Sequence, residues 1–166
     1  MTTPQAPVWN KFDLTGSIKA YAEYLHQESV RVFLQDKTHV QIMFLFNEDG
    51  IISVNPVPPK VEHLQVYEAI RGSIIQYDLY GVILLGECWM YLPKNPKDHT
   101  VAQIMDGEIK VSELNNADRK EVLHMKMESK DGVSAVYLNR ILRTGSNVDL
   151  GKDEIMDGVE QKWFVA

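Results

Sequence analysis

Glu87 is the residue whose surroundings most directly suggest chemistry. It stands in the tetrapeptide GECW (residues 86–89), immediately after the apolar run Val82 to Leu85. A carboxylate on an apolar strand must be paired or must have a shifted pKa, and carboxylates held in this way are common in active sites. The alternative is that the strand reaches the edge of the sheet before Glu87, so that this carboxylate faces solvent or pairs with Arg71 or Arg140.

A small enzyme or ligand-binding protein would use Glu87 together with other polar side chains. The catalytic candidates beside it are Arg71, His124 and Arg140, which lie on three other predicted elements. This hypothesis requires the four side chains to converge around a cavity. No other residues of the chain are singled out as catalytic.

The histidines do not have the spacing of metal ligands, and no metal site is predicted. No two of them stand four residues apart in the sequence: His26, His39, His63, His99 and His124. Such a pair is what a helical zinc site requires. His124 shares one face of a predicted strand with Lys126 and Glu128, and the simplest interpretation is that this face is solvated.

Glu108 and Lys110 formally resemble the acidic-x-Lys element of restriction-type nucleases, with Asp98 and Asp106 upstream. In that element carboxylates hold a divalent ion and the lysine supports the attacking water. It requires a strand at the centre of a core, whereas here the residues lie in a polar segment beside Gly107. The sequence therefore favours turn residues.

The remaining motifs exclude several classes of site. Cys88 is the only cysteine, so no disulfide within the chain and no thiolate zinc site is predicted. Its apolar neighbours favour a buried small side chain over a nucleophile. Glycines occur singly, without a phosphate-binding loop or a Gly-x-Ser-x-Gly motif, so no cofactor is predicted.

Composition indicates an ordinary globular protein. The 166 residues are 45% hydrophobic and 24% charged, with a net charge of -6. Basic residues are scattered, and Arg119-Lys120 is the longest basic run, so nucleic acid is not favoured as a partner. No apolar run approaches the length of a membrane span and no signal sequence is recognised, so we expect a cytoplasmic protein without membrane association.

The first half of the chain predicts a helix, a hairpin and a second helix. Apolar spacing indicates a helix from Ser17 to about Leu34, capped by Ser17 or Thr15. Val40–Phe46 and Ile51–Val54 predict a β-hairpin around Gly50. A second helix follows from about Lys60 to Tyr77.

The second half predicts strands. Tyr80–Leu92 reads as a central strand buried on both faces. After the polar segment 94–119, for which no structure is assigned, residues 121–128 and 133–142 form a second hairpin. Residues 161–165, which include Trp163 and Phe164, are expected to add a last edge strand.

The predicted fold is therefore α+β, with a mostly antiparallel sheet of about five to six strands and two main helices. The order is α-β-β-α-β, a long connection, then β-β and one further β. Residues 1–11 are expected to be a flexible arm, and residues 12–166 a single domain. In element order alone, residues 17–143 resemble roadblock-type and other profilin-like domains, but the long segment and the missing C-terminal helix depart from that pattern. No residue role is carried over.

Three function classes fit the sequence. The first is a non-enzymatic interaction or accessory domain, which pairs with itself or with another protein through a sheet edge or a surface of Met and Trp side chains. That surface would comprise Trp89, Met90, Tyr91, Met125, Met127, Trp163 and Phe164. The second is the enzyme or ligand-binding protein with Glu87. The third, suggested by the small acidic chain, is a phage or mobile-element accessory protein.

Overall fold

The computed structural model describes residues 5–91, 100, 103–104, 106–110, 113–114 and 119–164. Within these residues the helices and strands follow one another as α1 (Leu14–Asp36), β1 (Ile42–Asn47), β2 (Gly50–Pro56), α2 (His63–Tyr77), β3 (Gly81–Tyr91), β4 (Arg119–Ser129), β5 (Ser134–Thr144), β6 (Asn147–Leu150) and β7 (Glu154–Asp157).

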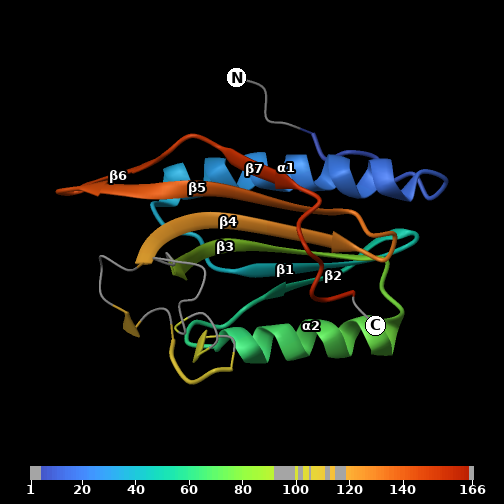
Figure 1. Cartoon of the computed structure of the whole chain (residues 1–166). Helices are drawn as coiled ribbons and strands as arrows, with labels where there is room; N and C mark the ends of the chain where they lie inside the picture. Colours follow the sequence, from blue (N-terminus) through green and yellow to red (C-terminus); the bar gives the residue numbers. More distant parts are fainter. Residues whose placement is uncertain are drawn as a thin grey trace.

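The strands form one antiparallel sheet between the two helices. The strand order is β2-β1-β3-β4-β5-β6, and β7 also pairs with β5. α1 covers one face of the sheet and α2 covers the other (Figure 1). The predicted α+β class, its antiparallel sheet and its two main helices are confirmed, and the described residues contain seven strands rather than five or six.

α1 begins at a capping residue that the sequence analysis missed. The Asp13 carboxylate accepts a hydrogen bond from the Gly16 N–H at 3.0 Å and so satisfies a donor at the start of the helix. The predicted cap at Ser17 or Thr15 is wrong, because both residues lie inside α1, and the Ser17 hydroxyl donates to the Asn10 carbonyl instead. The buried apolar side chains of the helix are Ile18, Ala22, Leu25 and Phe33.

Both predicted hairpins are confirmed. β1 and β2 are joined by a turn that ends at Gly50, whose φ of +124° suits glycine, and β4 and β5 are joined by a turn that contains Gly132. In the first hairpin Phe44 pairs with Val54, and the register shifts after Leu45. This shift is a β-bulge in β2.

β3 is the central strand, as predicted. It lies between β1 and β4, and Val82 to Leu85 are buried on both faces. The core on the α1 face contains Ile18, Ala22, Leu25, Phe46, Tyr80, Ile83, Leu85, Met125, Met127 and Ala135. The core on the α2 face contains Leu45, Val66, Ile70, Leu79, Val82, Leu84 and Trp163.

The C-terminal part of the chain differs from the prediction. Two short strands, β6 and β7, form in the polar stretch before residue 158, whereas residues 161–164 form no strand. These last described residues instead cross the α2 face, where Trp163 is buried in the core. The predicted edge strand at 161–165 is therefore wrong over its described residues.

Much of the polar segment 94–119, including Asp98 and His99, lies outside the described residues. Residues 106–109 form a turn and a bend, so the turn predicted around Glu108 is confirmed. Lys110 Nζ lies 2.9 Å from a carboxylate oxygen of Glu62, at the start of α2. The carboxylate and lysine of the nuclease-like element are thus not on a core strand.

In the part of the chain that the structure describes, no helix combines the length and the apolar character needed to cross a membrane.

Candidate functional site

Glu87 is hydrogen bonded to the backbone of the segment that leads into β1. Its carboxylate accepts a hydrogen bond from the His39 N–H at 2.9 Å, and its own N–H donates to the His39 carbonyl at 3.1 Å. The Gln41 side-chain amide donates to the Glu87 carbonyl at 3.1 Å. The polar groups of Glu87 therefore fasten two segments of the chain together.

Gly86 permits this close approach. Its φ is +136°, and a Cβ atom there would lie 2.6 Å from the Gln41 Cα atom, which is nearer than packed atoms approach. Beside it, Glu87 borders a surface hollow of ≈ 270 Å³ lined by His39, Val40, Gln41, Val57, Pro58, Pro59, Lys60 and Val61. The charged groups on this wall are Glu87 and Lys60.

The four candidate site residues lie on different sides of the sheet. Glu87 pairs with Leu123, which packs against Phe33 of α1, whereas His124 pairs with Gly86. Because successive residues of a strand face opposite sides, Glu87 projects towards the α1 face and His124 towards the α2 face.

The two arginines lie apart from Glu87 as well. Arg71 is on α2, and its guanidinium donates to the Trp163 carbonyl at 3.0 Å. Arg140 is exposed on β5, where it pairs with Val122. The structure thus places His124 and Arg71 on the α2 side of the sheet and Glu87 on the other.

Cys88 is partly buried on β3, whereas a buried side chain was predicted. Burial raises the pKa of this thiol to about 12, so that it stays protonated at neutral pH. Among the described residues, no three His, Cys, Asp or Glu side chains are grouped as a metal ion would need.

Glu128 is a buried charged residue that the sequence analysis assigned to a solvated face. Its side chain is 0% exposed, so the prediction of a solvated face is wrong at this position. One carboxylate oxygen accepts from the backbone N–H groups of Lys162, Trp163 and Phe164 at 2.9, 2.8 and 3.4 Å. Three amides satisfy one oxygen of a buried charge in this way.

Lys126 completes the environment of Glu128. Its Nζ atom lies 3.0 Å from the second carboxylate oxygen, an ion-pair distance, although the angles are not those of a hydrogen bond. The same Nζ atom lies 4.8 Å from the centre of the Trp163 ring. The C-terminal segment therefore covers the face of β4 that carries these two charges. We refer to His63, His124, Lys126, Glu128 and Trp163 as the β4 polar cluster.

His124 of this cluster is neutral at physiological pH. Burial, with smaller contributions from Lys126 and His63, lowers the pKa of His124 to about 4. Burial also lowers the pKa of His63, and here Lys126 and Lys162 contribute. The His124 Nδ1 atom is buried and makes no hydrogen bond within the described part of the chain.

We predict that acid destabilises the fold through His124. His124 binds a proton near pH 6.5 in the unfolded chain and only near pH 4 in the folded chain. Its contribution to the free energy of unfolding is therefore fully present above pH 6.5 and is lost as the pH falls towards 4. The expected slope is about 1.4 kcal/mol per pH unit. Urea unfolding between pH 7 and pH 5 measures it, and His124→Gln should flatten the dependence. An equal slope in wild type and variant would contradict the assignment.

The surface of Met and Trp side chains proposed from the sequence does not form as predicted. Met125, Met127 and Trp163 are buried in the two cores, and Trp89 is partly exposed. The exposed apolar residues instead lie elsewhere, and β2 carries three of them.

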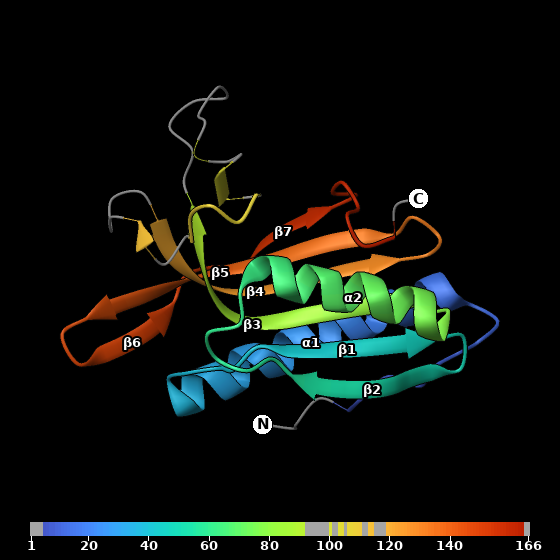
Figure 2. The same ribbon diagram turned by 90° about the horizontal axis from the view of Figure 1, so that it is seen from below.

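β2 is an edge strand without charge. Its residues Gly50–Pro56 include no acidic or basic side chain, and Ile51, Ile52 and Val54 are 39%, 45% and 52% exposed. Figure 2 shows β2 at the outer rim of the sheet, clear of α2. Natural edge strands avoid pairing with other chains by means of charges, proline or bulges. β2 lacks charges, although it has a bulge near its start and Pro56 at its end.

The other outer strands differ from β2 in this respect. β6 carries Asp149, and β7 carries Glu154 and Asp157. Among the described strands, an exposed, apolar and uncharged edge is thus found at β2.

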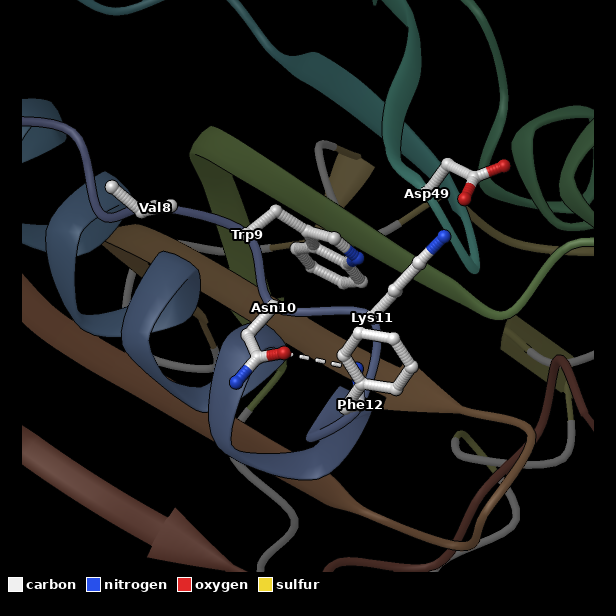
Figure 3. Close-up of a pocket in the computed structure, with 6 residues that line it drawn as sticks. All are labelled: Val8, Trp9, Asn10, Lys11, Phe12 and Asp49. Carbon is white, nitrogen blue, oxygen red and sulfur yellow. Dashed lines mark hydrogen bonds between the residues drawn. The ribbon is translucent and has the colours of Figure 1, made fainter.

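The N-terminal arm adds apolar surface beside the start of β2. The Trp9 ring stacks on Phe46 at 5.4 Å, and its indole N–H donates to the Glu48 carbonyl at 2.8 Å. Val8 and Phe12 are 90% and 89% exposed. Figure 3 shows the open hollow between these arm residues and Asp49 of the β1–β2 turn.

The comparisons with known proteins add a family. The family model described as bacteriophage lambda protein ea47 matches residues 9–166. No curated protein and no solved structure matches the chain. The likeness to roadblock-type domains therefore remains one of element order. The match covers nearly the whole sequence and supports the phage interpretation, so the chain belongs to the family of bacteriophage lambda protein ea47.

Proposed function

We propose that this protein is a non-enzymatic phage accessory domain that binds a protein partner by adding a strand to the outer edge of β2. The main support is the edge strand β2, which is uncharged and exposes three β-branched side chains. Strand addition gives affinity through main-chain hydrogen bonds, and exposed side chains on the two faces give selectivity.

The backbone of β2 offers an outward N–H at Val54 to such a partner. The Val57 N–H donates inward to the Gln41 carbonyl. Since the direction of N–H groups alternates along an antiparallel strand, the Val54 N–H points outward, away from β1. Pro56, which has no N–H, occupies the next outward position, as expected for proline in an edge strand.

The contacts of Glu87 and Glu128 favour binding over catalysis. The Glu87 carboxylate accepts from the backbone of His39, and the Glu128 carboxylate accepts from three backbone N–H groups. Both acids hold segments of the chain in place. A general acid or base must be free to exchange a proton with a substrate, and these two oxygens are engaged within the protein.

Capture of partners from phage-infected cells tests the proposal. We would compare wild type, Val54→Lys and the control Ile155→Lys, which changes a side chain of similar exposure (53%) on β7. A lysine on an edge strand opposes strand addition because its charge loses hydration. We expect wild type and Ile155→Lys to capture the same phage proteins, and we expect Val54→Lys to lose them. Retention of the same proteins by all three would refute β2 as the binding edge.

A further inference from the structure

We infer that one partner of β2 is a second copy of this chain, joined antiparallel so that the two sheets become continuous. This inference rests on the proposed function and names its partner. A strand without charge can pair with itself without placing like charges side by side, and Gly50–Pro56 meets that condition.

The charges beyond the two ends of β2 are complementary in such a pair. Glu48 and Asp49 precede the strand, and Lys60 follows it. Antiparallel pairing brings the acidic end of each copy towards the basic end of the other. Parallel pairing would instead place the acidic ends together, so the charges favour the two-fold arrangement.

A two-fold axis at Ser53 lies directly after the bulge in β2, where the regular alternation of the strand begins. It places Ile52 of one copy opposite Val54 of the other, both of which are exposed and β-branched. The outward Val54 N–H then meets the partner strand, and Pro56 lies near the end of the paired region, where its missing N–H costs little.

The N-terminal arms enlarge the contact. Val8 lies in the same arm as Trp9, whose indole is hydrogen bonded to the β1–β2 turn, and Phe12 directly follows the arm. Both side chains are about nine-tenths exposed. In the two-fold arrangement each arm comes close to the far end of the partner's β2, where Val57 and Pro58 follow the strand. A specific interface buries roughly 1,000 Å² or more in total, and the exposed Val8 and Phe12 side chains would add apolar area to the contact between the two strands.

Light scattering after size-exclusion chromatography tests the self-pairing of the full chain. Wild type should approach twice the monomer mass as its concentration rises. Val54→Lys, and Val54→Pro as a second variant that removes the outward N–H, should raise the dissociation constant more than tenfold. Ile155→Lys should leave it unchanged. Circular dichroism confirms that each variant is folded.

Cysteine cross-linking tests the register. In Ser53→Cys the two introduced thiols meet at the two-fold axis, within disulfide range, so oxidation should give a covalent dimer. The same substitution at Ile155 should not cross-link. A wild type that stays monomeric at every concentration, with no cross-link at residue 53, overturns self-pairing. Loss of captured phage proteins in Val54→Lys would still support β2 as a binding edge, so the two failures are distinguishable.

Discussion

Glu128→Ala is expected to lower the free energy of unfolding by about 3–5 kcal/mol, the usual cost of removing one partner of a buried ion pair. The substitution leaves Lys126, which is only partly exposed, without its counter-ion. It also leaves the N–H groups of residues 162–164 without their acceptor. Urea unfolding at pH 7 measures the loss.

Two matched variants separate charge from position. Glu128→Gln keeps an oxygen acceptor for the backbone N–H groups and should cost less than Glu128→Ala. Glu154→Ala removes an exposed carboxylate from β7 and should change stability by less than about 0.5 kcal/mol. If Glu128→Ala were as mild as Glu154→Ala, the C-terminal segment would not depend on this carboxylate.

Gly86→Ala is expected to destabilise the fold more than Gly132→Ala. Both glycines have positive φ, so both substitutions carry a backbone cost of about 1–3 kcal/mol. Only at Gly86 does the new Cβ atom also meet the backbone of Gln41, whereas nothing lies within 4 Å of it at Gly132. The difference between the two losses measures the close approach beside Glu87.

Thermal unfolding with circular dichroism gives both values. We expect the melting temperature of Gly86→Ala to lie below that of Gly132→Ala by several degrees. Equal melting temperatures would mean that the segment leading into β1 moves away from the new Cβ atom without loss of stability. In that case Glu87 would not hold the two segments together.

The main elements were predictable because their signals are local. The turns with Gly50 and Gly132 and the alternating residues of β4 identify both hairpins, and the continuous apolar run identifies β3 as central. β6 and β7 lack such signals, since each has four residues and little apolar alternation. Their position depends on pairing with β5, which no short window of sequence contains.

The charged residues of β4 were misassigned for a related reason. Lys126 and Glu128 alternate with buried methionines, which is the pattern of a strand with one solvent-exposed face. That face is covered by residues 162–164, more than thirty positions later in the chain. A contact between residues so far apart in the sequence leaves no periodic signal. The aromatic residues at 163 and 164 were the one hint that this segment covers β4.

The candidate site illustrates the same limit. The sequence correctly marked Glu87 as a carboxylate that must find a partner, but its proposed partners were arginines. Its partner is the backbone of His39, and backbone donors are the same for every residue type. His39 is the partner of Glu87 because the backbone geometry at Gly86 brings the two segments together.

Hydrogen exchange of the Val54 amide is the most direct test of β2 as the binding edge. The account predicts fast exchange in dilute monomer and exchange at least tenfold slower in the assembled state, either with a captured partner or at high protein concentration, while the amides of β7 are unchanged. Fast exchange of the Val54 amide in every assembled state would contradict the account.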